Sequence, residues 1–153
     1  MACHRHHNLE GALAQAAALC AERGVRLTEQ RRRVLELVWR SHKPLGAYDI
    51  LAAIQAVQPR AAPPTVYRAL DFLLDQGLIH KLQSLHAYVG CAHPGEPHAG
   101  QFLICTACGD VTELEDAGVA RSLGKVAAAT GFEPDLPMVE LTGTCSDCRE
   151  DKR

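Results

Sequence analysis

Residues 63–77 read Pro-Pro-Thr-Val-Tyr-Arg-Ala-Leu-Asp-Phe-Leu-Leu-Asp-Gln-Gly, and this stretch predicts the helix on which the fold depends. Proline suits the first helical turn, where the backbone N–H has no intrahelical partner. The apolar residues recur at the three- and four-residue spacing of one buried helix face: Val66, Leu70, Leu73 and Leu74. Gly77 ends the pattern.

Three further helices are predicted before residue 63. The first two follow the capping residues Asn8 and Thr28 and run to Gly24 and to about Trp39. The third covers about residues 47–58, after a breaking segment, Lys43-Pro-Leu-Gly46.

Two short extended runs, residues 78–82 and 87–89, follow the fourth predicted helix. Several helices followed by a short hairpin match a winged helix-turn-helix, in which the last helix enters the DNA major groove. A helical bundle with no role in nucleic-acid binding is the alternative that this topology leaves open.

Length and composition indicate a globular protein. The chain has 153 residues, of which 47% are hydrophobic and 22% charged. It has no uninterrupted apolar stretch near the roughly 18 residues of a membrane span and no signal-like start, so we expect a cytoplasmic protein. Residues 1–84 carry 11 basic and 7 acidic residues and residues 85–153 carry 5 and 11, which indicates two domains with different partners.

The second half predicts a small domain with mixed secondary structure. Residues 91–101 are rich in proline and glycine and are expected to form a linker. Beyond them the sequence predicts strands at 102–104, 111–114 and 138–141 and a helix at 117–130. A module of about 50 residues buries little core by itself, so dimerisation or a structural metal would help it fold.

Four of the seven cysteines form two Cys-X-X-Cys pairs: Cys105, Cys108, Cys145 and Cys148. Two residues between thiolates let both sulfurs reach one ion, and four thiolates favour a closed, tetrahedral Zn²⁺ site. The spacing therefore predicts a structural zinc. A redox Cys-X-X-Cys pair is the weaker alternative, because nothing around it resembles a thioredoxin.

A second metal site is suggested around Cys91. Four histidines lie on either side of it, His80, His86, His93 and His98, and an acidic ligand could come from Glu96, Glu113 or Glu115. One thiolate among imidazoles favours zinc over ferrous iron or manganese. Spacing alone leaves the choice among these residues open. Cys20, in contrast, belongs to a predicted buried helix face.

The chain resembles the ferric uptake regulator superfamily, and within it the zinc uptake regulator branch most of all. The matching stretches lie in order over about residues 20–148: Arg23-Gly-Val-Arg-Leu-Thr-Glu-Gln-Arg31, Ala47-Tyr-Asp-Ile-Leu51, residues 63–77, Ile79-His-Lys81, Ala87-Tyr-Val-Gly-Cys91, Phe102-Leu-Ile-Cys-Thr-Ala-Cys-Gly109 and the Cys145/Cys148 pair. The resemblance is carried chiefly by the Thr-Val-Tyr-Arg-Ala-Leu helix together with the two cysteine pairs.

The resemblance implies an α+β protein with a winged-helix DNA-binding domain (1–85), a hinge carrying metal ligands (86–100) and an α/β dimerisation domain with the structural zinc (101–153). It implies a zinc-responsive regulator that, as a zinc-loaded homodimer, binds an AT-rich inverted-repeat operator and represses zinc-uptake genes. The regulatory zinc would be held by His80, Cys91, His98 and Glu113, giving two zinc ions per subunit. The implied DNA contacts are Tyr48, Thr65, Tyr67 and Arg68, with Arg31 and Lys81 expected at phosphates.

An iron, manganese or peroxide sensor of the same superfamily is the alternative function, although Cys91 and the sparse histidines before Cys105 favour zinc. Enzyme activity and a small-molecule substrate are not expected, because four ligands leave no open metal position. His86 and His93 could support a weak third site, and the Cys3/His4/His6/His7 cluster has no assigned role.

Overall fold

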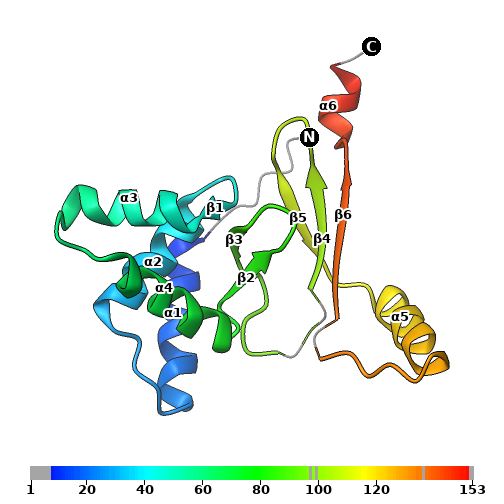
Figure 1. Cartoon of the computed structure of the whole chain (residues 1–153), viewed down its shortest axis with the longest axis horizontal. Coiled ribbons are helices and arrows are strands. Elements are labelled where there is room, and N and C mark those ends of the chain that lie inside the picture. The colour runs from blue at the N-terminus through cyan, green and yellow to red at the C-terminus, as the bar shows by residue number, and fades with distance from the viewer. Residues whose placement is uncertain (1–7, 97, 99, 136, 152–153) are drawn as a thin grey trace. The chain divides into compact units, whose positions relative to one another are not determined.

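The computed structural model describes residues 8–96, 98, 100–135 and 137–151. The chain divides into two compact units, with the boundary after Glu96 (Figure 1). The Cys3/His4/His6/His7 cluster lies outside the described residues.

The N-terminal unit contains the four predicted helices: α1 (Leu9–Glu22), α2 (Glu29–Arg40), α3 (Ala47–Val57) and α4 (Pro63–Asp75). Asn8 and Thr28 cap the first two helices as predicted, because each side-chain oxygen accepts a hydrogen bond from the backbone N–H three residues later. Proline occupies the first turn of α4, where it sets the helical φ without the loss of a hydrogen bond.

The core of this unit forms where α2 packs against the other three helices. Val66, Leu70 and Leu73 of the predicted α4 stripe are fully buried, and Leu74 is partly buried against the same core. Burial of each such side chain contributes about 1.5–3 kcal/mol. The buried stripe determines which side of α4 faces the core, and residues on the opposite side, such as Tyr67 and Arg68, are exposed.

The wing is a three-stranded antiparallel sheet. Strands β2 (Ile79–Leu82) and β3 (Ala87–Gly90) form the predicted hairpin. The other edge of β3 pairs with β1 (Leu45–Gly46), which gives the order β1-β3-β2. The sequence did not predict β1, because a two-residue strand has no periodicity and exists only through its pairing with β3.

The C-terminal unit contains β4 (Gly100–Cys105), β5 (Val111–Leu114), α5 (Ala117–Ala129), β6 (Met138–Gly143) and α6 (Ser146–Glu150). Its strand order is β5-β4-β6, with β4 antiparallel to β5 and parallel to β6. A parallel pair requires a long crossover, and α5 lies within it. Strand β4 begins inside the stretch expected to be a linker, and the short helix α6 was not predicted. None of the described helices is long and apolar enough to cross a membrane.

Trp39 of α2 lies directly against the backbone of β3 at Gly90. A Cβ atom at position 90 would lie 2.5 Å from Trp39 Cε2, which is closer than van der Waals contact permits. Glycine at this position therefore allows the indole of α2 to pack on the wing.

We expect Gly90→Ala to destabilise the protein by about 1–3 kcal/mol, because the indole has to move out of a packed position. Urea unfolding followed by far-UV circular dichroism measures this loss. Gly143→Ala in β6 is the matched control, since an added Cβ there meets no atom within 4 Å. Equal stability of the two variants would contradict the packing role of Gly90.

Candidate metal centres and DNA-reading surface

The parallel register of β4 and β6 brings the two cysteine pairs together. Cys105, the last residue of β4, lies opposite Gly143, the last residue of β6. The chain beyond Gly143 then carries Cys145 beside the turn that holds Cys108. The Sγ atoms of all four residues lie within 4.8 Å of one another: Cys105, Cys108, Cys145 and Cys148.

Local backbone geometry completes this cluster at both ends. After β4 the chain turns back through Gly109, whose φ of 78° favours glycine, and its N–H donates to the Cys105 carbonyl over 2.9 Å. At the other end Cys145 is the N-cap residue of α6, so Cys148 follows one helical turn later. Two neighbouring turns thus point four sulfurs at one place.

The pKa of the Cys105 thiol is lowered, which favours the thiolate that binds a cation. Backbone N–H groups of Cys108 and Cys145 donate hydrogen bonds to its sulfur and lower the pKa of Cys105 to about 6. The Cys145 N–H lies 3.4 Å from that sulfur. Cys105 is therefore largely a thiolate at neutral pH, even before a metal binds.

The other sulfurs hold their protons more firmly. The Cys148 thiol donates hydrogen bonds to the neighbouring sulfurs, first of all that of Cys145, and this raises the pKa of Cys148 to about 12. A backbone hydrogen bond at Asp110 lowers the pKa of Cys108, but the Cys105 sulfur and burial outweigh it and the net shift is upward. Four converging sulfurs of which one is already anionic fit the donor set of structural Zn²⁺.

The C-terminal unit also contains a close pair of potential ligands, His98 and Glu113. Glu113 lies on β5 opposite Phe102 of β4, and His98 precedes β4 by two residues. His98 Nε2 and Glu113 Oε1 are 2.9 Å apart. A histidine hydrogen-bonded to a carboxylate is a common arrangement at metal sites. The C-terminal unit thus supplies two potential ligands, half of a four-ligand set.

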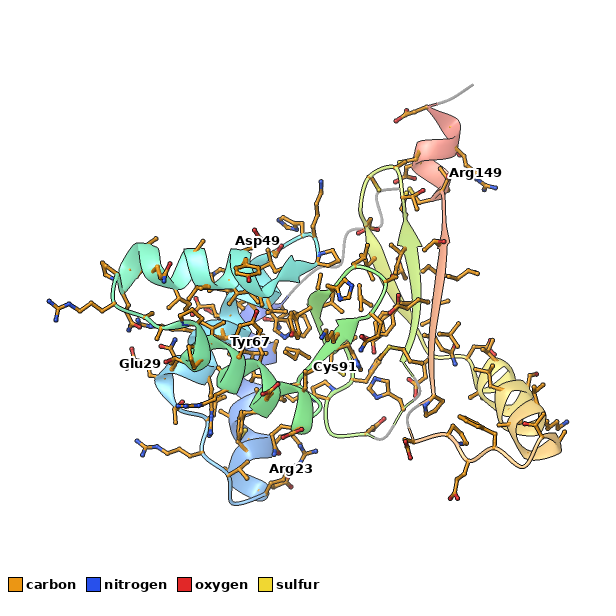
Figure 2. All side chains as sticks on the ribbon, viewed as in Figure 1. Arg23, Glu29, Asp49, Tyr67, Cys91 and Arg149 are labelled. Carbon is orange, nitrogen blue, oxygen red and sulfur yellow. The ribbon has the colours of Figure 1, made fainter. Side chains whose placement is uncertain are left out.

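The N-terminal unit contains a second such pair, His80 and Cys91. His80 lies in β2, and Cys91 follows β3 directly and donates its backbone N–H to the Leu78 carbonyl over 3.1 Å. This bond extends the hairpin by one residue and fixes Cys91 beside β2. A ring nitrogen of His80 and Cys91 Sγ lie within 4.8 Å of each other. Figure 2 labels Cys91 at this end of the wing.

Sequence reasoning missed one buried polar contact in the C-terminal unit, at Gln101. Its side-chain amide donates to the Asp116 carbonyl over 2.9 Å and accepts from the Asp116 N–H over 3.1 Å. Gln101 thereby fixes the chain between Glu113 and the start of α5. Nothing in the sequence marks this glutamine, which was expected in the linker.

The residues expected to contact DNA bases are exposed on α3 and α4. Tyr48, in the first turn of α3, is 80% exposed and Tyr67 on α4 is 43% exposed. Figure 2 labels Tyr67 on α4. Thr65 and Arg68 are exposed on α4 as well. These four side chains lie on the side of the helix-turn-helix that the core leaves uncovered, as a DNA-reading surface requires.

The two expected phosphate contacts lie in different surroundings. Lys81 is half-buried on β2, with its Nζ 5.9 Å from the centre of the Tyr88 ring. The Arg31 guanidinium lies 3.7 Å from the centre of the Phe72 ring and donates to the Arg26 carbonyl over 2.6 Å. Arg31 is thus engaged inside its own unit.

Sequence comparison identifies the family to which this architecture belongs. Residues 22–141 match the sequence model of the Ferric uptake regulator family. The chain belongs to this family. It is 44% identical to the zinc uptake regulation protein of Escherichia coli K12, over 90% of this chain and 81% of that protein. The peroxide operon regulator of Bacillus subtilis is 30% identical over 89% of this chain and 92% of that protein.

Solved structures within the family agree with the fold. The structure of a zinc uptake regulator in complex with zinc and DNA matches with a TM-score of 0.90 and 42% identity, over 95% of this chain and 97% of that chain. The expected α+β class, with a winged helix-turn-helix followed by a dimerisation domain, is thereby confirmed. So is the resemblance to the zinc branch.

We expect zinc binding at the four-cysteine cluster to weaken steeply as pH falls, because thiols must lose their protons to ligate. At about pH 8 the raised pKa values keep Cys108 and Cys148 protonated, so at least two protons leave per zinc bound. Below about pH 6 Cys105 is protonated too, and the number of protons released per zinc ion rises by one.

Competition with a chelator of known affinity, across this pH range and in a Cys91→Ser background, measures the dependence as the slope of log affinity against pH. An affinity that does not change with pH would contradict the protonation states inferred for the cluster.

Proposed function

We propose that the protein is a zinc-responsive transcriptional repressor, which as a zinc-loaded homodimer binds operator DNA and represses genes of zinc uptake. The observation that carries this proposal is the pairing of an exposed recognition helix with two sets of zinc-type ligands, in a chain 44% identical to a zinc uptake regulation protein. A protein of this kind acts on chromosomal DNA, so we place it in the cytoplasm. It is a regulator and not an enzyme.

The first zinc would be structural. Its proposed ligands are the four sulfurs described above, Cys105, Cys108, Cys145 and Cys148. These residues join the end of β4 to the start of α6, so a metal bound there closes the sheet at the end where β4 and β6 stop. A closed set of four protein ligands leaves no position for a reacting water.

The second zinc would be regulatory, with two ligands from each unit. His80 and Cys91 belong to the unit that carries the recognition helix, and His98 and Glu113 belong to the other unit. A thiolate, two imidazoles and one carboxylate suit Zn²⁺ better than the oxygen-rich sets preferred by manganese. His86 and His93 remain the residues proposed for a weak third site.

Regulation would follow from the division of these ligands. When bound to all four side chains, Zn²⁺ supplies a link between the DNA-binding unit and the dimerisation unit. Through His80 and Cys91, the bound metal then restricts how the unit that carries α4 can be oriented relative to the dimerisation unit. The entropy lost in fixing that orientation is therefore lost when zinc binds and does not weaken DNA binding. By linkage, operator DNA must tighten zinc binding by the same factor.

The recognition surface assigns roles to individual side chains. Arg68 is proposed to contact guanine with two hydrogen bonds, and Tyr67 and Thr65 to contact neighbouring bases or phosphates. Tyr48 would reach the DNA from α3, and Lys81 would neutralise a phosphate from the wing.

The dimer is proposed to use α5. None of its residues is buried in the chain, and Leu123 and Val126 are 41% and 66% exposed. Phe132, just beyond the helix, is 66% exposed. An apolar stripe of this kind is typical of a surface that a second subunit covers.

We expect Val126→Glu to shift the protein from dimer to monomer, because the new carboxylate would be buried without a partner. Size-exclusion chromatography with light scattering measures the mass. The matched control is Lys125→Glu, an exposed neighbour that lies about 100° further round α5 and outside the apolar stripe, and it should leave the dimer intact. If the Val126→Glu variant remains a dimer, the apolar face of α5 is not the dimer interface.

We expect zinc to switch on binding to an AT-rich inverted-repeat duplex, and Glu113→Gln to raise the free zinc needed by at least about tenfold, because a neutral amide is a poorer ligand. Fluorescence anisotropy in zinc buffered by a chelator measures the switch. Glu115→Gln, an exposed neighbour on the same segment, is the matched control and should behave as wild type.

A parallel titration with ferrous iron separates zinc sensing from the alternative within the family. Equal activation by iron, or DNA binding that ignores metal, would overturn the zinc-responsive function and leave the fold unaffected.

A further inference from the structure

Two arginines, Arg23 at the C-terminal end of α1 and Arg31 in the first turn of α2, contact the C-terminal half of α4. Arg23 Nη1 donates to the Gln76 carbonyl over 2.7 Å and lies 3.2 Å from Gln76 Oε1. Arg31 lies over the Phe72 ring, 3.7 Å from its centre. Figure 2 labels Arg23 at the end of α1. The helix that reads DNA is thus fixed at two successive turns.

These two contacts lie on the face of α4 that leads to Arg68. Arg68, Phe72 and Gln76 follow one another at intervals of four residues, so they form one row along the helix. The arginine contacts are made at the second and third members of the row. A rotation of α4 about its axis that moves Arg68 would therefore break both contacts.

Each contact has a physical reason to be stable. The Gln76 carbonyl lies at the C-terminal end of α4, where unpaired carbonyls and the helix dipole attract a cation. The Arg31 guanidinium stacks on an aromatic face and also donates to the Arg26 carbonyl over 2.6 Å. Arg26 belongs to the loop between α1 and α2, so Arg31 joins that loop to α4.

We propose that Arg23 and Arg31 are positioning residues that set the rotation and position of α4, and hence the placement of Arg68 in the major groove. This gives Arg31 a different role from the phosphate contact expected from the sequence, because its guanidinium is turned onto Phe72 and the Arg26 carbonyl. The inference rests on the proposed DNA-binding function.

A positioning residue and a phosphate contact differ in measurable ways. Loss of a phosphate contact weakens binding to all sequences alike and lowers the slope of log affinity against log salt by about 0.9. Loss of a positioning residue displaces Arg68, so it weakens binding to the operator more than binding to random DNA and leaves the salt slope unchanged.

The test compares zinc-loaded full-length Arg31→Lys with Arg32→Lys, the same change at the neighbouring exposed arginine. Lysine keeps the charge but cannot stack as a plane or donate in two directions. Anisotropy on operator and random duplexes over a salt series is the measurement. We expect Arg31→Lys to reduce the ratio of operator to random affinity about tenfold with an unchanged salt slope, and Arg32→Lys to keep the wild-type ratio.

A second pair of variants tests whether Arg31 acts through Phe72. Phe72→Leu removes the ring and leaves the arginine in place, so it should lower the same ratio. In the Arg31→Lys/Phe72→Leu double variant, the ratio of operator to random affinity should fall no further than it does in the more affected single variant. If Arg31→Lys fails to fold, as judged by circular dichroism, Arg23→Lys applies the same test at an exposed contact.

An operator-to-random ratio that stays at the wild-type value in Arg31→Lys, Phe72→Leu and Arg23→Lys would overturn the inference. So would a uniform loss with a reduced salt slope in Arg31→Ala, which would show a phosphate contact. Wild-type protein in the same assay reports separately on the proposed function. Zinc-dependent operator binding by wild type with unaffected variants rejects the positioning role alone, and wild type that binds no DNA rejects both.

Discussion

The parallel pairing of β4 with β6 is the constraint on which the C-terminal unit depends. These strands are separated in sequence by β5 and α5, and only their pairing brings Cys145 beside Cys105. Among the described residues of this unit few large apolar side chains are buried, chiefly Phe102, Ile104 and Val111, so its core alone offers limited stabilisation. A zinc cross-link at the end of these strands would act beside the last three residues of β6, which are exposed. A stable sheet in turn fixes Glu113 and the start of α5, the parts we connect to sensing and dimerisation.

The N-terminal unit meets a different requirement. It has to expose one face of α4 and restrict rotation of the helix about its own axis. Val66, Leu70 and Leu73 bury one side of it completely, and this determines which residues are exposed. Apolar packing tolerates small rotations, however, whereas hydrogen bonds and stacking of a planar guanidinium are directional. The contacts at Phe72 and Gln76 add that directionality at the end of the helix away from Thr65. In our proposal the apolar core and the two arginines together place the residues expected to contact DNA.

Much of this protein could be predicted from the sequence because its signals are local. Helix caps such as Asn8 and Thr28, the periodic stripe of α4 and the Cys-X-X-Cys spacing each depend on residues close together in the chain. Elements that depend on distant partners were missed: β1 exists through its pairing with Tyr88, and Gln101 is marked only by its contact with Asp116. The proposed role of Arg31 was also missed for this reason. Its charge favoured a contact with DNA phosphate, whereas its aromatic partner Phe72 lies 41 residues away in the chain. The assignment of individual metal ligands around Cys91 came from the family resemblance, since spacing allowed several sets.

The packing of Trp39 on Gly90 has a practical consequence. Trp39 is the single tryptophan of the chain, and Gly90 immediately precedes Cys91. Indole emission depends on the polarity and packing around the ring, so any rearrangement of the backbone at this proposed ligand alters the surroundings of one defined fluorophore. The unlabelled protein therefore contains its own optical reporter beside Cys91, a proposed regulatory ligand, with no background from a second tryptophan.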